Sequence, residues 1–207
     1  IYTLSLHDAL PILLHDTKVG NRCVFGYGTK IAGDCVIEDG VIFSSSVIEN
    51  AKTRVGSGAM IQAGTTFSKD VPPYIICTKQ VEYGGVNVQV AHQHGVDDKT
   101  LKHIANAYRL VFHGKTAIFD AVNQIEEQVP DGPFIRHVIE FLRTTKIGII
   151  TKIYANNTIA AACEPLLLCY YDVITTWHQH DLSHYDFALV INVDAFRGGL
   201  FLQAAPI

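Results

Sequence analysis

Apolar and small residues recur with a period of six along the first third of the chain. Nine consecutive six-residue units run from Val19 to Pro72, and eight of their nine first positions are apolar. The fourth position of the units holds no apolar residue, and the third is mostly small or polar. An inward apolar residue followed by a tight turn every six residues is typical of a parallel β-helix, in which three units close one triangular coil. The first positions are Val19, Phe25, Ile31, Ile37, Phe43, Glu49, Val55, Ile61 and Phe67, and the fourth are Arg22, Gly28, Asp34, Gly40, Ser46, Lys52, Gly58, Gly64 and Asp70.

The nine units predict three stacked coils with one inward ladder on each face. Val19, Ile37 and Val55 are expected to form one such ladder, because positions 18 residues apart superimpose from coil to coil. Glu49 is the single charged residue in the inward column. It indicates either a bulged corner or a fault in the register.

The chain divides by composition into five segments. Residues 3–12, TLSLHDALPI, resemble one translated frame of a sequencing-library adapter, so residues 1–12 are set aside as an artefact. The β-helix is expected over residues 13–73 and to end at the proline pair Pro72 and Pro73, which cannot continue a paired coil. Residues 74–96 indicate an extended connection. Residues 154–207 match no recognisable pattern and are left unassigned, either as non-native sequence or as an accessory tail.

A helical period governs residues 97–153. The first predicted helix begins at Asp97 or Asp98 and ends at Gly114, the second ends before Pro130, and the third begins at Pro133. Their expected apolar faces carry Leu101, Ile104, Ala105, Tyr108, Val111 and Phe112, then Ile118, Phe119, Val122 and Ile125, then Phe134, Ile135, Val138, Ile139 and Leu142. Such short helices can bury these faces only against each other and the wall of the β-helix.

Charge and cysteine content exclude several functional classes. The chain has 16 basic and 20 acidic residues and a net charge of -4, which gives no electrostatic basis for binding nucleic acid. Its five cysteines are odd in number and form no Cys-x-x-Cys pair, which favours reduced thiols in a cytosol. Cys23 and Cys35 fall in the fifth column and are expected to be small packing residues. His178, His180 and His184 have metal-like spacing without a predicted scaffold, so no metal site is expected.

Six segments of the chain together resemble a known family. They are HDTKVGNRC (15–23), IAGD (31–34), KDVPPYI (69–75), GGVN (84–87), IANAYRLVFHGKT (104–116) and the terminal IIT (149–151). The chain from Leu13 to Ile153 resembles the acyl-carrier-protein-dependent UDP-N-acetylglucosamine O-acyltransferases of the hexapeptide-repeat class. Because the resemblance begins inside the repeat array, we expect an N-terminally truncated piece with weak or no activity of its own.

The resemblance implies a fold, a reaction and an assembly. The fold would be mainly β, a left-handed parallel β-helix followed by a small α-helical C-terminal domain. The reaction would move a 3-hydroxyacyl group from acyl carrier protein to the 3-hydroxyl of UDP-N-acetylglucosamine, the first step of lipid A biosynthesis in the cytoplasm of a Gram-negative bacterium. The enzyme would be a homotrimer with active sites between neighbouring solenoids. No cofactor is expected.

Two residues carry the implied chemistry. The sugar hydroxyl needs a base, and an imidazole that titrates near neutrality suits that role. His15 matches the family's catalytic histidine, and Asp16 beside it could orient the ring or stabilise its charge. His15 is also the only histidine of the repeat region once the first twelve residues are set aside.

The implied substrate-binding positions depart from the family pattern. Asp34 stands where many members have the histidine of Ala-Gly-His, and Asn50-Ala51 where they have His-Gln. Ala63 matches a small residue lining the acyl-chain groove, although a tight corner explains it equally well. Asn87 matches a nucleotide contact, and the arginine pair expected near Gln93 and His94 is missing. These departures leave two alternatives open, the related UDP-3-O-acylglucosamine N-acyltransferase and a non-catalytic hexapeptide-repeat scaffold.

Overall fold

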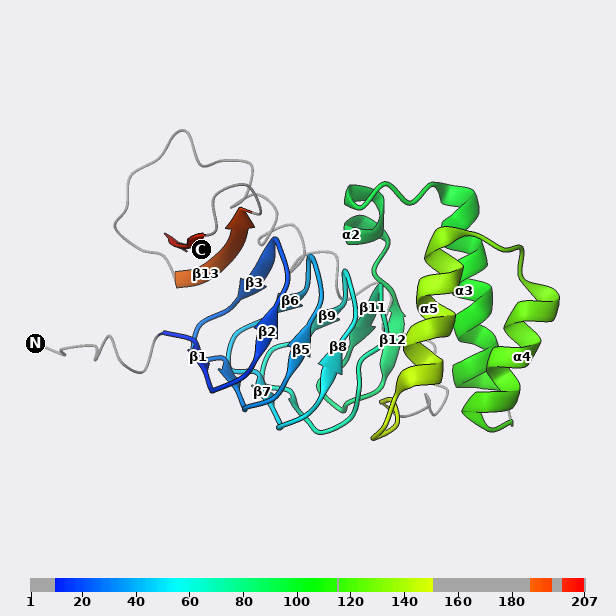
Figure 1. Cartoon of the computed structure of the whole chain (residues 1–207), viewed down its shortest axis with the longest axis horizontal. Helices are drawn as coiled ribbons and strands as arrows, with labels where there is room; N and C mark the ends of the chain where they lie inside the picture. The colour runs from blue at the N-terminus through cyan, green and yellow to red at the C-terminus, as the bar shows by residue number, and fades with distance from the viewer. Residues whose placement is uncertain (1–9, 115, 151–186, 195–198, 207) are drawn as a thin grey trace, which may run out of the picture.

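The computed structural model describes residues 10–114 and 116–150, together with the backbone of two further strands at 187–194 and 199–206. Three predicted features lie outside the described residues: most of the supposed adapter segment (1–9), the three histidines His178, His180 and His184, and most of the 154–207 tail. Within the described part of the chain, none of the helices has both the length and the apolar character needed to span a bilayer. Figure 1 shows a solenoid of short strands with helices packed at one end.

The solenoid is a triangular prism built from three parallel sheets. The strands are β1 (Ile12–Leu13), β2 (Lys18–Val19), β3 (Cys23–Phe25), β4 (Lys30–Ile31), β5 (Val36–Ile37), β6 (Ile42–Phe43), β7 (Ile48–Glu49), β8 (Arg54–Val55), β9 (Met60–Ile61), β10 (Thr66–Phe67) and β11 (Ile75–Cys77). Face 1 contains β1, β4, β7 and β10; face 2 contains β2, β5 and β8; face 3 contains β3, β6, β9 and β11. The predicted left-handed parallel β-helix is therefore confirmed, as is the ladder of Val19, Ile37 and Val55.

Each corner of the prism is made by one residue in the left-handed region of the backbone. The fourth residue of every unit from Arg22 to Gly64 has a φ between 55° and 70°, and Asp16, one unit earlier, has a φ of 59°. This region is open to glycine and tolerable for short polar residues, but costly for β-branched and bulky apolar ones. The absence of apolar residues from the fourth column thus follows from the backbone that the column must adopt.

The interior contains two stacked columns of side chains. The first-column residues from Phe25 to Phe67 are at most 2% exposed, and the fifth-column residues from Cys23 to Val71 are all 0% exposed. Cys23 and Cys35 pack in this second column, as expected, with each thiol within hydrogen-bonding reach of a carbonyl oxygen of the next coil. Burial raises the pKa of Cys23 to about 11, so its thiol keeps its proton at neutral pH.

The β-helix does not end at Pro72 and Pro73, so that expectation was wrong. Strand β11 follows the prolines and pairs in parallel with β9, Ile76 opposite Met60. Earlier strands pair 18 residues apart, as in Ile12 with Lys30, whereas this last coil is two residues shorter. Strand donors such as the N–H of Lys30 point to the following coil. The prolines lie at a corner of the last coil, where no further coil requires an N–H from them.

Neither expected explanation of Glu49 was right. Glu49 keeps the regular register, between Ile31 of β4 and Phe67 of β10, and its side chain points inward with 1% exposure. No bulge relieves it. A carboxyl group is therefore stacked in the apolar core, and its partners are described with the candidate site.

The expected connection at 74–96 has more structure than an extended loop. It contains β11, the antiparallel strand β12 (Tyr83–Val86) and the short helix α2 (Val88–Gln93). Helix α2 was missed because only Val90 and Ala91 of its six residues are buried, too few to give a helical period. Asn87 caps it, accepting a hydrogen bond from Val90 N.

Three longer helices follow, α3 (Asp98–His113), α4 (Ile118–Gln128) and α5 (Pro133–Thr144). Their predicted start and stop residues hold, since α3 begins after Asp97 and ends before Gly114, and α5 has Pro133 at its first turn. Two expected core positions are wrong. Ala105 is exposed while Ala107 is buried, and Phe119 is 66% exposed while Ala121 is buried. Each helix packs on two neighbours, which rotates its buried face away from the simplest apolar stripe.

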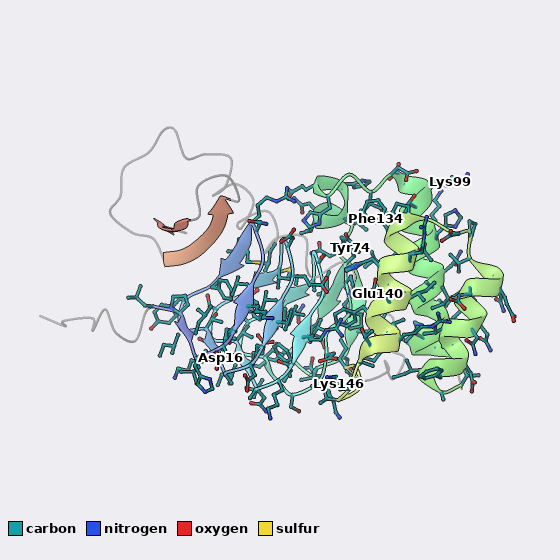
Figure 2. The ribbon with its side chains drawn as sticks, in the orientation of Figure 1. Asp16, Tyr74, Lys99, Phe134, Glu140 and Lys146 are labelled. Carbon is teal, nitrogen blue, oxygen red and sulfur yellow. The ribbon has the colours of Figure 1, made fainter. Side chains whose placement is uncertain are left out.

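Helix α5 joins the helical unit to the wall of the β-helix. His137 Nε2 lies 2.8 Å from Glu38 Oε2, which also accepts hydrogen bonds from the N–H and hydroxyl of Ser57. The hydrogen bond with Glu38 raises the pKa of His137. Figure 2 shows Tyr74 and Phe134 at the junction of the two units, with ring centroids 6.0 Å apart. The two units therefore form one packed body.

Two segments outside the predicted β-helix pair with strands near its N-terminal end. Ile12, inside the segment set aside as an artefact, pairs with Lys30 in β1. Backbone pairing is available to any sequence, so this contact says nothing about the segment's origin. Near the C-terminus of the chain, β13 (Phe187–Asp194) and β14 (Gly199–Pro206) form a hairpin, and β13 pairs antiparallel with β3. The hairpin covers the free edge of face 3 (Figure 1).

We expect Ile31→Asp to destabilise the protein by about 3 kcal/mol or more, because the new charge would be buried next to Glu49 without a partner. Lys30→Asp is the matched control, since Lys30 is the exposed neighbour on the same strand and should change stability by about 0.5 kcal/mol or less. Chemical unfolding followed by circular dichroism measures both. Equal stability of the two variants would contradict the inward register of β4.

Candidate active site

Four of the predicted site residues gather at the corner between face 1 and face 2. His15 and Asp16 follow β1, Asp34 follows β4 and Asn50 follows β7. Because these strands are neighbours in face 1, the residues after them line the same edge of the prism on three successive coils. All four are exposed. The solenoid thus brings together residues up to 35 positions apart on one edge.

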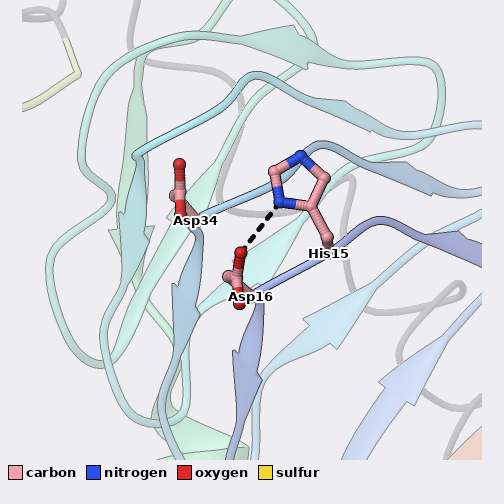
Figure 3. Close-up of side chains that lie close together, drawn as sticks. All are labelled: His15, Asp16 and Asp34. Carbon is pink, nitrogen blue, oxygen red and sulfur yellow. Dashed lines mark hydrogen bonds and ion pairs between the residues drawn. The ribbon is translucent and has the colours of Figure 1, made fainter.

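His15 and Asp16 form a pair at the start of this edge. His15 Nδ1 lies 3.0 Å from Asp16 Oδ2, and the two side chains are 75% and 78% exposed (Figure 3). An ionised carboxylate only accepts hydrogen bonds, so the contact favours the tautomer with its proton on Nδ1. The Nε2 lone pair is then available to accept a proton. This is the arrangement that a general base requires.

Asp34 stands one coil further along, close to the pair. Its backbone N–H donates to the His15 carbonyl at 3.1 Å, and its φ of 61° makes the corner. Ligand atoms of His15, Asp16 and Asp34 all lie within 4.8 Å of one another. The three could reach one cation, but exposed acidic groups often lie this close without one. We assign no metal to them.

Gly33 lies directly beneath the imidazole. A Cβ on this residue would stand 2.9 Å from Cε1 and 3.0 Å from Nε2 of His15. The φ of Gly33 lies outside the left-handed region, so its backbone does not require glycine. The missing side chain instead gives the His15 ring room to lie against the wall of the prism.

The backbone at Asn50 is held from inside the core. Its carbonyl oxygen lies 2.8 Å from Thr53 Oγ1 and 3.3 Å from Cys35 Sγ. Thr53 Oγ1 also lies 2.6 Å from Glu49 Oε1. Sequence reasoning missed this buried polar cluster, although a charged residue in an apolar column was a signal that it existed.

The two remaining predicted residues lie on other edges. Ala63 is exposed at the corner between face 3 and face 1. Asn87 contacts the corner between face 2 and face 3, where its Nδ2 donates to the Gly58 carbonyl at 3.1 Å. With 1% exposure and its Oδ1 capping α2, Asn87 uses both ends of its amide within the chain. Within one chain, the structure does not bring these residues to His15.

His94, near the missing arginine pair, packs on the same corner as Asn87. Its ring lies over Gly40, whose lack of a side chain leaves room for it, and its centroid is 5.8 Å from that of Tyr74. Burial and the nearby Arg22 guanidinium lower the pKa of His94. Arg22 therefore supplies a fixed positive charge close to the place where the family pattern led us to expect arginines.

A cavity of about 580 Å³ lies elsewhere, between α4 and α5. Four charged residues at its rim form two ion pairs, Arg143 with Glu126 at 2.7 Å and Arg136 with Asp131 at 3.1 Å. It is remote from the edge that carries His15, because α4 and α5 pack at the far end of the solenoid (Figure 1). The candidate site is an open edge of the prism and not this cavity.

The fold and its edge define a class of protein, a left-handed β-helix of hexapeptide repeats with a helical unit at its C-terminal end. Comparison with known families makes the match more specific. Residues 70–150 match the sequence model of the family described as "Udp N-acetylglucosamine O-acyltransferase; Domain 2". The resemblance stated from the sequence motifs is thereby confirmed.

Curated relatives and solved structures agree with this match. An acyl-[acyl-carrier-protein]–UDP-N-acetylglucosamine O-acyltransferase of Anaeromyxobacter sp. (strain K) is 29% identical over 136 residues, 65% of this chain and 53% of the relative. The same-named protein of Xylella fastidiosa is 28% identical over 136 residues, 65% of this chain and 52% of the relative.

Among solved structures, LpxA from Bacteroides fragilis, a UDP-N-acetylglucosamine acyltransferase, aligns with a TM-score of 0.66 and 37% identity. LpxA from Acinetobacter baumannii aligns with a TM-score of 0.65 and 25% identity. In each case the alignment covers 68% of this chain and 55% of the other. The chain therefore spans about half the length of the relatives that it matches.

We expect Gly33→Ala to displace the His15 ring, because a Cβ would stand 2.9 Å from Cε1 and 3.0 Å from Nε2 of the exposed imidazole. The same Cβ would stand 3.0 Å from the His15 carbonyl oxygen, so we also expect a loss of stability of about 1 kcal/mol. Nitrogen-edited NMR of the imidazole should show shifted His15 signals. Gly132→Ala is the control, since a Cβ there meets no atom within 4 Å. Unchanged His15 signals in Gly33→Ala would contradict the role assigned to Gly33.

Proposed function

We propose that this chain carries the catalytic edge of an O-acyltransferase that moves a 3-hydroxyacyl group from acyl carrier protein to the 3-hydroxyl of UDP-N-acetylglucosamine. The observation that carries the proposal is the His15–Asp16 pair with Nε2 unoccupied, on an edge of the β-helix that these acyltransferases share. The named relatives transfer to oxygen, which favours this reaction over the N-acyltransferase. It would be the first step of lipid A biosynthesis, in the cytoplasm of a Gram-negative bacterium.

The mechanism assigns one proton to His15. Nε2 accepts the proton of the sugar 3-hydroxyl as its oxygen attacks the thioester carbonyl, forming a tetrahedral intermediate. Asp16 stabilises the imidazolium through its contact with Nδ1. When the intermediate collapses, the C–S bond breaks and the imidazolium returns its proton to the departing thiolate. The ester and the free carrier thiol are the products, and the base is regenerated.

The remaining residues of the edge suit the acceptor. Asp34 and Asn50 present a carboxylate and an amide on the two coils beyond His15, and both groups can hydrogen-bond sugar hydroxyls. Asp34 and Asn50 each stand where many family members have a histidine. The substitutions remove side chains that could bind the sugar nucleotide as cations. We therefore expect the sugar to be held by neutral and acceptor contacts along this edge.

We further propose that the active enzyme is a homotrimer. His15 and the corner on which Asn87 packs lie on different edges of one prism, so a single chain cannot present both edges to one substrate. A neighbouring copy could bring this second edge against the His15 edge. Leu14, Ile12 and Ile48 are 52%, 44% and 40% exposed on or beside face 1, and they offer apolar area for such a contact. In a closed ring of three copies, each His15 edge would contact the neighbouring copy in the same way.

We expect His15→Ala to reduce acyl transfer by roughly 10²–10⁴-fold while leaving substrate binding largely intact, because it removes only the base. Transfer of labelled acyl groups from acyl carrier protein measures the activity. His113→Ala is the control, since this histidine lies in α3, away from the edge. Full activity of the His15→Ala protein would show that the base lies elsewhere, whereas absence of transfer by the parent would favour the non-catalytic scaffold.

Analytical ultracentrifugation tests the assembly. The active species should sediment with three times the mass of the chain, because each site needs two neighbouring solenoids. Leu14→Glu places a charge on the exposed apolar area and should lower both trimer content and activity. A stable monomer with full activity would contradict the shared site.

A further inference from the structure

Glu49 is a carboxyl group buried in an otherwise apolar ladder. It stacks between Ile31 and Phe67, and 1% of it is exposed. Its Oε2 has no hydrogen-bond partner among the described residues. A buried carboxylate in this state would be strongly unfavourable, whereas a neutral acid would leave only a carbonyl-like oxygen unpaired.

Two short contacts link Glu49 to the backbone of the candidate site. Thr53 Oγ1 lies 2.6 Å from Glu49 Oε1 and 2.8 Å from the carbonyl oxygen of Asn50. Thr53 itself is 0% exposed, so its hydroxyl is out of reach of bulk solvent. Cys35 Sγ lies 3.6 Å from the same hydroxyl and 3.3 Å from the Asn50 carbonyl.

The number of protons decides the direction of these bonds. The Thr53 hydroxyl has one hydrogen but two short acceptor contacts, to Glu49 and to Asn50. If Glu49 were ionised, Thr53 could donate to only one of them. If Glu49 carries a proton, it donates to Thr53 Oγ1, and Thr53 donates to the Asn50 carbonyl. Only the protonated form makes both contacts hydrogen bonds.

We propose that Glu49 is held as a neutral acid and acts through Thr53 as a positioning residue for Asn50, so that one buried proton fixes the backbone of this edge. The relay consists of two hydrogen bonds and runs from the buried Glu49 to the backbone of the exposed Asn50. That Asn50 contacts the sugar nucleotide rests on the proposed function. The relay itself, and the experiment below, do not depend on it.

The electrostatic surroundings agree with this geometry. Burial is the largest cause that raises the pKa of Glu49, the contacts with Thr53 and Cys35 lower it, and the nearby Asp70 raises it, for a net pKa of about 8. Burial and the Glu49 carboxyl also raise the pKa of Cys35, which keeps that thiol neutral beside the acid. Cys35 and Asp70 are the titratable groups that act on Glu49, and its ladder neighbours Ile31 and Phe67 are apolar.

The raised pKa of Glu49 makes the stability of the protein depend on pH. Above the ordinary value of 4.5, the unfolded chain loses the Glu49 proton while the folded chain keeps it up to about 8. The unfolded state then binds fewer protons, so this group's effect on stability becomes less favourable as pH rises from about 4.5 to about 8 and is constant above. Glu49→Leu should abolish this dependence and melt at a higher temperature than the parent at pH 8.

Infrared and NMR spectroscopy of the full chain test the relay. The parent should show the C=O stretch of a protonated carboxyl below pH 8, absent from Glu49→Gln and unchanged in the exposed control Glu127→Gln. The amide signal of Ala51, which shares a peptide group with the Asn50 carbonyl, should move with pH at the same midpoint. In Thr53→Val, which keeps the shape but removes the hydroxyl, that movement should disappear.

Each readout can overturn the proposal. An ionised Glu49 at neutral pH, seen as no protonated-carboxyl band, would contradict the neutral acid. If the Ala51 amide signal of the parent does not change with pH, Glu49 does not act on Asn50. Should Thr53→Val fail to fold, Glu49→Gln replaces it, since an amide can still donate to Thr53 but cannot titrate, and its Ala51 signal should remain constant.

Discussion

The whole structure depends on one backbone constraint, a left-handed residue at every sixth position. From Asp16 to Gly64 the fourth residue of each unit turns the chain by one corner, and two extended residues then pair with the coils on either side. Because every turn has the same geometry, positions 18 residues apart superimpose. A missing or additional residue would rotate an entire face out of register, and the array tolerates such a change only in its last coil, where no later coil must match.

The same repetition creates the candidate site. A compact globular fold brings distant residues together through several unrelated contacts, whereas the solenoid does so by stacking one corner on the next. His15, Asp34 and Asn50 share an edge because they occupy neighbouring positions in successive coils. The edge is open to solvent, so the proposed acyl donor and sugar nucleotide would not have to enter an enclosed pocket to reach it.

Stability and function make opposing demands at this edge. The core under Asn50 contains Glu49 where the column otherwise holds valine, isoleucine or phenylalanine. Burying a carboxyl group costs stability, and the cost is reduced when the group stays protonated and bonded. The glycine under His15 likewise gives up packing in exchange for space for a ring. Both residues lie next to the corner that carries the candidate base, Gly33 in the corner itself and Glu49 in the core beneath it.

The sequence alone determined the repeat, the corner column and most of the helix boundaries, because these depend on local periodicity. A short motif that resembles a family made His15 and Asp16 candidates for the site. The sequence could not determine whether Glu49, Ala105 and Phe119 are buried, or that the β-helix continues past the Pro72–Pro73 pair. Each of these depends on what packs against the residue. Periodicity gives the direction of a side chain but not its partners. Only the tertiary structure placed Thr53 between Glu49 and Asn50, put Gly33 under the imidazole and assigned Asn87 to a different edge from His15, because these contacts join separate coils or separate units.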